Sequence, residues 1–454
     1  MGICATDNKT TELFADGGIL KKTYGGASLR LHSPELKEIA VTAEKPWEWL
    51  LGYQSVIPDG AGGYFLYYRG MGTSRTYHYD ECEKQVTCIC HSPDGINFTR
   101  LDTGFLWEGS RKNNIVYAGV VCHNFTPFYD TNPGCPPSQR FKALGGVYDN
   151  AETGGLYALS SEDGIVWRLL SEKPVFTSGA FDSQNVAFYD PVLGKYRLYS
   201  RYWHTGRADI HEFGGFRAIQ SCVSDDFLHW GEGVPNDYGE PIAEHFYTNA
   251  VCPCPGAEHI LLSFPNRFNE SRKRVAEHDG MGISDTVFMA GRDGVKWTRL
   301  FKESWLRPGL DDANWTDRNM MVGPGIVVGQ DGNFSLYCSE HNYKDHRIRR
   351  LAIRRHGFVS LSAGWETGCG ETKPFLYEGG RLRLNYSTSA AGYVRAWLAD
   401  AAETFAIPEN AAELYGDALD EAYPLEEKEE LVGKHVRLCF QLKDADVYAY
   451  RFTL

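Results

Sequence analysis

The sequence predicts an all-β protein, a five-bladed β-propeller followed by a C-terminal β-sandwich. Two observations carry this prediction: a short motif that recurs five times at steps of 63 to 69 residues, and strand-like apolar runs around each copy. The chain has 454 residues, too many for one ordinary core. We expect an N-terminal segment at 1–44 that packs on the propeller or the sandwich, the propeller at 45–361, and the sandwich at 362–454.

The recurring motif is Ser-x-Asp-Gly-x-x-Trp/Phe. It stands as SPDGINF at 92–98 and as SEDGIVW at 161–167, with looser copies at 224–230, 292–297 and 355–358. An Asp-Gly pair between two apolar runs is typical of a tight hairpin. Each copy is therefore expected to join the outer two strands of one unit, and we assign these turns to folding rather than to catalysis.

A second feature recurs 36 to 43 residues upstream of the last four motif copies, where an Asn opens an apolar run. These residues are Asn124, Asn185, Asn249 and Asn319, and Tyr53 holds the equivalent place in the first unit. A strand rich in Tyr, Phe and Leu follows each of them. Four strands per repeat of this length are typical of a propeller blade, so five repeats predict five blades.

The period stops after residue 361, but strand-like runs continue. Examples are RLRLNYSTS at 381–389 and VYAYRFTL at 447–454. Gly-rich and acidic segments separate these runs. About 90 residues of this kind suit an antiparallel sandwich.

Composition excludes some classes of partner. A net charge of -13 opposes binding to nucleic acid. The sequence contains no run of about 18 apolar residues, so no membrane span is predicted. The first residues lack the apolar segment of a signal peptide, so the chain as given is expected in the cytoplasm, or outside it if a signal was removed. The 12 cysteines include no C-x-x-C pair, so we expect buried free thiols rather than zinc ligands. No metal or cofactor is predicted, and the oligomeric state stays open.

The blade geometry predicts where functional side chains converge. The innermost strand of a blade starts at the face where the antiparallel second strand ends. Side chains at these points should meet in one funnel at the axis. They are Trp47, Glu48, Arg69, His123, Asn124, Asp182, Asn185, Arg201, Glu244, Tyr247, Asn249, Arg267, Asp317, Arg318, Asn319, Glu340 and His341.

Acids in this set point to glycoside hydrolysis, which needs one carboxyl group to protonate the leaving oxygen and one carboxylate to attack or to activate water. Asp182 and Asp317 stand two or three residues before a repeated Asn, and with Glu244 they are the predicted catalytic residues. The remaining residues of the set are expected to bind an oligosaccharide or glycoside. Two alternatives stay open: the aspartates could cap turns or pair with arginines, and the repeated Asn side chains could brace the backbone.

Seven segments carry a resemblance that spans nearly the whole chain: PWE at 46–48, HNFTPF at 123–128, FDSQN at 181–185, FYTNAV at 246–251, RPGLDDANWTDRN at 307–319, LNYSTSAAG at 384–392 and VRLCFQLKDADVYAY at 436–450. In these segments the sequence resembles a family of five-bladed propeller glycosidase relatives, similar to glycoside hydrolase families 32, 43 and 68. In families 32 and 43 three acids at inner-strand starts act in catalysis, and the resemblance implies that role for Asp182, Glu244 and Asp317. The invertase opening motif and the Glu-Cys acid motif are missing, which argues against fructan cleavage.

The predicted function is therefore a glycoside hydrolase. One alternative is a phosphorolytic glycosidase, in which Arg201, Arg267, Arg318 and His341 would hold phosphate. The other is a carbohydrate-binding propeller without turnover, since propellers serve binding as readily as catalysis.

Overall fold

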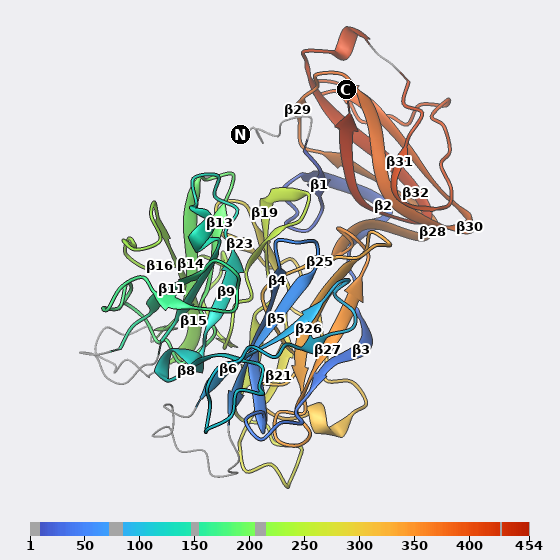
Figure 1. The fold of residues 1–454 in the computed structure, drawn as a ribbon. Helices are drawn as coiled ribbons and strands as arrows, with labels where there is room; N and C mark the ends of the chain where they lie inside the picture. The colour runs from blue at the N-terminus through green and yellow to red at the C-terminus, as the bar shows by residue number, and fades with distance from the viewer. Residues whose placement is uncertain (1–9, 72–84, 147–153, 205–214, 427–428, 454) are drawn as a thin grey trace. The chain divides into compact units, whose positions relative to one another are not determined.

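The computed structural model describes residues 10–71, 85–146, 154–204, 215–426 and 429–453 (Figure 1). The described residues are nearly all in strands, turns and loops, and their helical segments are short 3-10 turns. Two compact units emerge: residues 34–352 form the larger one, and residues 1–33 with 353–454 form the smaller one. The predicted N-terminal segment 1–44 is thus divided between the two units.

The larger unit begins with three antiparallel sheets whose strands follow chain order. The first contains β4 (Leu50–Pro58), β5 (Tyr64–Met71), β6 (Val86–Ser92) and β7 (Thr99–Arg100), with β8 (Ile115–Ala118) on β6. The second contains β9 (Thr126–Tyr129), β10 (Phe141–Gly145), β11 (Tyr157–Ser161) and β12 (Arg168–Leu169). The third contains β13 (Val186–Asp190), β14 (Lys195–His204), β15 (Phe216–Ser224) and β16 (Val234–Pro235).

The next part of the chain forms two short sheets that continue one another. One holds β17 (His245–Phe246), β20 (Asn266–Asn269) and β21 (Ile283–Thr286), and the other holds β18 (Cys252–Cys254), β19 (Ala257–Ser263), β22 (Met289–Gly291) and β23 (Trp297–Thr298). Backbone hydrogen bonds bridge the gap between them: Phe264 N donates to Asn249 O at 3.0 Å, and Val287 N donates to Pro265 O at 3.0 Å. Pro265 lacks the N–H that an uninterrupted ladder needs there.

The last sheet of the larger unit takes its outer strand from the start of that unit. It contains β24 (Met321–Val322), β25 (Val327–Val328), β26 (Phe334–Glu340) and β27 (Arg347–Ile353), and β3 (Glu35–Thr42) pairs antiparallel with β27. The two ends of the unit are therefore joined by strand pairing. Part of the predicted N-terminal segment thus supplies an edge strand of the larger unit.

Residues from several of these sheets line one cavity of about 920 Å³. Its lining includes Val56 of β4, Phe128 of β9, Phe188 of β13, Cys252 of β18 and Val328 of β25. Strands β4, β9, β13, β18 and β25 thus face a shared space.

The recurring Asp-Gly turns connect neighbouring sheets. A Tyr hydroxyl on the middle of one sheet donates to the carbonyl oxygen of the turn glycine in the next sheet. These bonds run from Tyr337 to Gly95, from Tyr67 to Gly164 at 2.6 Å and from Tyr199 to Gly294 at 3.0 Å. The first of them joins the last sheet to the first one. The turns have a structural role, as the sequence predicted.

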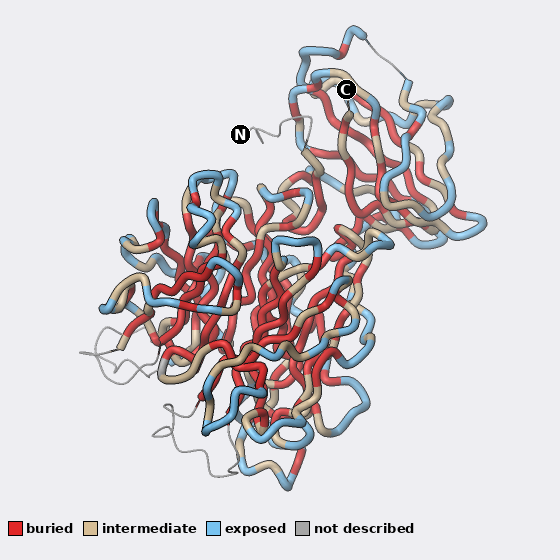
Figure 2. The backbone as a smooth tube through the Cα atoms, in the orientation of Figure 1, coloured by how far each residue is buried: buried red, intermediate tan, exposed pale blue. Residues whose placement is uncertain are grey.

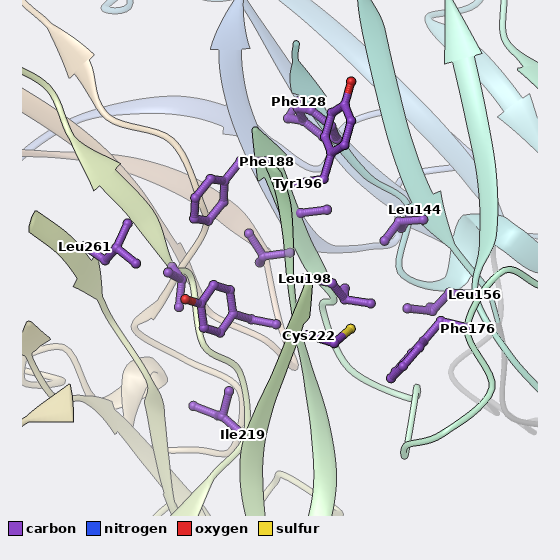
Figure 3. Close-up of a cluster of buried hydrophobic side chains, with 14 of the residues drawn as sticks. Phe128, Leu144, Leu156, Phe176, Phe188, Tyr196, Leu198, Ile219, Cys222 and Leu261 are labelled. Atoms are coloured by element: carbon purple, nitrogen blue, oxygen red, sulfur yellow. The ribbon is translucent and has the colours of Figure 1, made fainter. Parts of the chain in front are cut away.

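Apolar side chains fill the space between adjacent sheets. Figure 3 shows one such cluster, in which Phe128, Leu198 and Leu261 come from three different sheets. The residues that form these clusters are among the buried residues of the chain (Figure 2). The ten cysteines in the described part of the chain are buried free thiols, in agreement with the sequence prediction.

The smaller unit is built on one antiparallel sheet of long strands. Its order is β2 (Leu20–Leu31), β28 (Val359–Thr372), β32 (His435–Thr453), β30 (Arg381–Asp400) and β31 (Asp417–Ala422), with β1 (Glu12–Leu13) and β29 (Phe375–Leu376) also on β32. The β30–β32 register shifts between Thr388 and Tyr393, and the β28–β32 register shifts between Ala363 and Gly368. Such shifts bend a strand.

No helix in the part of the chain that the structure describes is long and apolar enough to cross a membrane.

Candidate functional site

Side chains near the starts of the innermost strands and on strands β5, β14 and β15 meet in what we term the central cluster. Its members are Tyr53, Arg69, His123, Asp182, Arg201, Arg217, Tyr247, Asp317 and Arg318. The Tyr53 and Tyr247 hydroxyl groups lie 2.9 Å apart and join the first sheet to the fourth part of the unit. The His123 ring lies 6.0 Å from the Tyr53 ring, and the Arg69 guanidinium lies 4.6 Å from it.

Asp182 forms the first carboxylate site of the cluster. Its Oδ1 lies 2.6 Å from His123 Nε2, and its Oδ2 lies 3.9 Å from an Arg201 nitrogen. Burial lowers the pKa of His123, although the hydrogen bond with Asp182 acts in the opposite direction. The imidazole is therefore neutral at neutral pH. The carboxyl group of Asp182 is 24% exposed, so a ligand can reach it.

Asp317 forms the second carboxylate site. Its Oδ1 lies 2.6 Å from His278 Nε2, and its Oδ2 accepts a hydrogen bond from Arg318 Nε at 2.7 Å. Burial alone would raise the pKa of Asp317, but His278 and the charge of Arg318 hold it below its ordinary value. Asp317 is consequently ionised at neutral pH.

The Tyr53–Tyr247 pair lies close to Asp182 and to Arg318, the partner of Asp317. Burial raises the pKa of Tyr53 well above its ordinary value, and the nearby Tyr247 and Asp182 raise it further. Burial lowers the pKa of Arg318, but Asp317, followed by Tyr247 and Tyr53, raises it above the ordinary value. Tyr53 therefore supplies a neutral hydroxyl group in the vicinity of Asp182 and Arg318.

A cavity of about 900 Å³ adjoins the central cluster. Two residues of its lining hydrogen-bond the cluster: His245 Nδ1 accepts from Arg217 N at 3.1 Å, and Ser284 Oγ accepts from Arg318 N at 2.8 Å. Trp315 also lines this cavity. The cavity is large enough for a sugar residue next to Arg217 and Arg318 of the cluster.

Glu244 lies in this cavity and not with the two aspartates. Its carboxylate receives hydrogen bonds from Arg299 at 3.1 and 3.2 Å, and an Arg267 nitrogen lies 3.5 Å away. Arg267 is itself bound by both carboxylate oxygens of Asp285, at 2.8 and 2.6 Å. The β17–β20 pairing places Arg267 opposite Phe246, and so brings it beside Glu244.

Glu48 and Trp47 belong to the framework of the first sheet. The Glu48 carboxylate is fully buried and accepts hydrogen bonds from Tyr68 Oη at 2.6 Å and from Arg100 at 2.9 and 2.7 Å. The Trp47 indole N–H donates to Asn114 Oδ1 at 3.0 Å. These contacts satisfy both side chains within the fold, so the predicted substrate-binding role is replaced by a structural one.

Glu340 and His341 are likewise held by neighbouring residues of the last sheet. The buried carboxylate of Glu340 accepts hydrogen bonds from Arg347 at 2.6 Å and from Arg349 at 2.8 Å. His341 Nε2 lies 2.7 Å from Asp311 Oδ2. The four residues predicted for phosphate are thus not gathered in one place: Arg201 and Arg318 lie in the central cluster, but Arg267 and His341 have other partners.

The repeated asparagines brace the backbone, which is the alternative that the sequence left open. Asn124 donates to Phe181 O and accepts from Gly146 N at 2.8 Å. The same kind of contact recurs in the other copies: Asn185 donates to Ser183 O at 2.7 Å, Asn249 to Gln184 O at 3.3 Å, and Asn319 to Ala313 O at 3.2 Å. Each of these side chains is buried. We leave them out of the candidate site.

The sequence did not predict Arg217 or His278 as residues of the site. It also did not predict that Tyr53 pairs with Tyr247. His278 lies in the loop between β20 and β21, 39 residues from its partner Asp317. No local pattern marks it. Arg217 lies opposite Trp203 in the β14–β15 pairing, and the predicted Arg201 precedes Trp203 by two residues; this register is not apparent from the sequence. Within the described residues, no group of three or more His, Cys, Asp or Glu side chains is placed to hold a metal ion.

Comparisons of the sequence with family models and with curated proteins find no match. Solved structures do match. A glycoside hydrolase superposes with a TM-score of 0.50 at 14% identity, over 71% of this chain and 92% of its own. An N-acetylgalactosamine deacetylase from F. plautii, in complex with blood group B trisaccharide, gives 0.47 at 12% identity, over 73% and 96% of the two chains. A glycoside hydrolase family 43 arabinoxylan arabinofuranohydrolase from Bacillus subtilis, in complex with cellotetraose, gives 0.42 at 11% identity, over 90% and 96%.

The agreement with the solved glycoside hydrolase concerns the backbone and not the site residues. Together with the sheets that surround a shared cavity, it shows that the chain has the fold of the glycoside hydrolase-like propeller proteins.

Proposed function

We propose that this chain is a glycoside hydrolase built on a five-bladed β-propeller with a C-terminal β-sandwich. Five blades result when the two short sheets that contain β17 to β23 are counted as one, which the bridging hydrogen bonds between them support. The strand pairing of β3 with β27 closes the ring of blades. The register shifts in β28 and β30 support a sheet that bends over itself into a sandwich.

The observation that carries the proposed activity is a pair of accessible carboxyl groups, each held by a histidine, in one cluster. Asp182 pairs with His123 and Asp317 pairs with His278. Both aspartates precede innermost strands; Asp182 lies near Tyr53, and Arg318, the partner of Asp317, lies near Tyr53 and Tyr247. Glycoside hydrolysis requires two carboxyl groups with different protonation states.

Asp317 is the ionised partner in this proposal. His278 and Arg318 hold its pKa low, so it attacks the sugar or activates water. Asp182 is the proton donor. His123 Nε2, 2.6 Å from Asp182 Oδ1, positions the carboxyl group that passes a proton to the leaving oxygen in this proposal.

The test is a screen of the purified protein against oligosaccharides and aryl glycosides. Asp182→Asn and Asp317→Asn should each lower kcat by roughly 10²- to 10⁴-fold with the fold intact. Asp59→Asn is the matched control, because Asp59 also pairs with a histidine, His91 at 2.9 Å, in a surface turn.

Activity that survives in both cluster variants would contradict the assignment of the two aspartates. Tight binding of an oligosaccharide without any hydrolysis would instead favour a carbohydrate-binding propeller.

A further inference from the structure

Two arginines of the central cluster lie side by side on the β14–β15 hairpin. Trp203 stands directly opposite Arg217 in the register, and Arg201 precedes Trp203 by two residues, on the same face. Their guanidinium groups lie 5.8 Å (Arg201) and 4.6 Å (Arg217) from the Trp203 ring. They lie 5.4 and 5.9 Å from the Tyr247 ring. The two cations therefore share the same two aromatic rings.

Neither cation has a close anionic partner among the described residues. Arg201 is buried, and the carboxylate oxygen within 4 Å of it is Asp182 Oδ2, at 3.9 Å. The guanidinium of Arg217 approaches His245 Nδ1 at 3.3 Å, and no described carboxylate forms an ion pair with it. The Nε–H groups of both arginines are buried and lack an acceptor in the described part of the chain.

A third arginine, Arg69, also has a buried Nε–H group without an acceptor in the described part of the chain. Arg69 is 7% exposed, and its guanidinium donates a hydrogen bond to the carbonyl oxygen of His123 at 3.1 Å. Arg69 and Arg201 both lower the pKa of His123, after the larger effect of burial, so both are close to that ring. The three arginines thus surround the site of Asp182.

Among the described residues, arginines outnumber carboxylates at this place, although the whole protein carries a net charge of -13. The charge of Asp317 is already matched by Arg318. Burial lowers the pKa of Arg217, and the charge of Arg201 lowers it further, while Tyr247, Glu270 and Asp182 act in the opposite direction. Cations that are buried without a counter-ion are unfavourable, and a bound anion relieves this.

The adjoining cavity of about 900 Å³ provides room for the group that carries the anion. Phe216 and Phe268 line it, and the Arg217 guanidinium lies 5.3 Å from the Phe268 ring. Aromatic faces suit the flat apolar side of a sugar ring. The ligand therefore combines an oxyanion with a sugar.

We propose that Arg201 and Arg217, supported by Arg69, bind the carboxylate of a uronic acid residue in the substrate. A planar guanidinium matches a carboxylate through two parallel hydrogen bonds, which is why arginine rather than lysine suits this task. This inference rests on the proposed function, because it places an acidic sugar beside the proposed proton donor Asp182.

The test measures binding by calorimetry to full-length Asp317→Asn protein, in which turnover is blocked. The probes are methyl glucuronide, methyl galacturonide, methyl mannuronide, the three matching neutral methyl glycosides, and inorganic phosphate. One uronide should bind at least about 10-fold more tightly than its neutral counterpart. Arg217→Gln should weaken binding of that uronide by roughly 10- to 100-fold and weaken binding of the neutral glycoside by a clearly smaller factor.

Two further variants complete the design. Arg217→Lys keeps the charge and should recover part of the affinity, which separates loss of the ligand contact from loss of the fold. Arg30→Gln, an exposed arginine of the smaller unit, should match the parent protein. Equal affinity for every uronide and its neutral counterpart would overturn the proposal, and so would phosphate that binds more tightly than all three uronides, since the site would then serve free phosphate.

Failure of this inference can be told apart from failure of the proposed function. If the Asp317→Asn protein binds a uronide selectively but the wild type hydrolyses no glycoside, the uronate site stands and the hydrolase does not. If the wild type hydrolyses neutral and acidic glycosides equally well, the hydrolase stands and the uronate site is overturned.

Discussion

Replacement of Glu48 by Gln tests whether this residue supports the fold rather than the substrate. Its carboxylate is fully buried between Arg100, the Tyr68 hydroxyl group and the backbone N–H groups of Glu44 and Lys45. Burial alone would raise the pKa of Glu48, but Arg100 and Tyr68 hold it below its ordinary value. Gln keeps the shape but leaves Arg100 without a counter-charge.

The magnitude follows from this geometry. Removing one partner of a buried ion pair costs about 3–5 kcal/mol. Because Arg100 is 23% exposed, water recovers part of this, and we expect a loss of about 2–4 kcal/mol. At about 2 °C per kcal/mol for a large unit, the melting transition should fall by about 4–8 °C.

The loss depends on pH in a defined direction. The pKa of Glu48 is lower in the folded protein than the value of about 4.3 that it has in an unfolded chain. Its stabilising contribution is therefore fully present above that unfolded value and disappears as the pH falls through the folded-state pKa. The difference between wild type and variant should be complete at pH 7 and shrink below about pH 4.

Thermal unfolding of the full chain, followed by circular dichroism at several pH values, measures this effect. Glu44→Gln is the matched control, since Glu44 is 61% exposed and its ion pair with Arg100 should contribute less than about 1 kcal/mol. A Glu48→Gln protein that melts with the wild type at pH 7 but has lost sugar binding would refute the structural role.

Three further predictions address the site and the framework. His278→Gln removes one of the two groups that lower the pKa of Asp317, so the acidic limb of the activity profile should move to higher pH, as measured by kcat/KM against pH; an unmoved limb speaks against Asp317 as the ionised group. Tyr337→Phe removes the bond to Gly95 between the last and first sheets and should destabilise the larger unit by about 1–2 kcal/mol in urea unfolding, whereas Tyr64→Phe, which loses only a 3.5 Å contact, should have a smaller effect. The ten described cysteines are buried, so they should react with a thiol reagent only after unfolding; rapid labelling of the native protein at these positions would contradict their burial.

Local patterns in the sequence predicted most of the strands and turns of the fold. The Asp-Gly turns and the repeated asparagines each lie within one hairpin or strand start, and both have the structural roles that their period implies. Asp182 and Asp317 could be identified for the same reason, since their distance from the repeated Asn places them at strand starts.

The remaining parts of the site depend on contacts between distant residues. Glu48 precedes an innermost strand as Asp182 does, but Arg100, 52 residues away, pairs with it inside the sheet. Glu244 is three residues from Tyr247, but the pairing of β17 with β20 turns it toward Arg267 and Arg299. The repeat identifies where each strand starts. It does not show which side chains at that place form an ion pair with an arginine elsewhere in the chain.

The pairing of β3 with β27 has a consequence for synthesis of the chain. Both partners of this contact must exist before the last sheet of the larger unit is complete, and about 300 residues separate them. The same holds for the smaller unit, in which β2 waits for β28 and β1 waits for β32. The larger unit therefore cannot close before β27 has left the ribosome, and the smaller unit cannot close before β32 has done so. Until then the early strands present unpaired edges to chaperones or to other nascent chains.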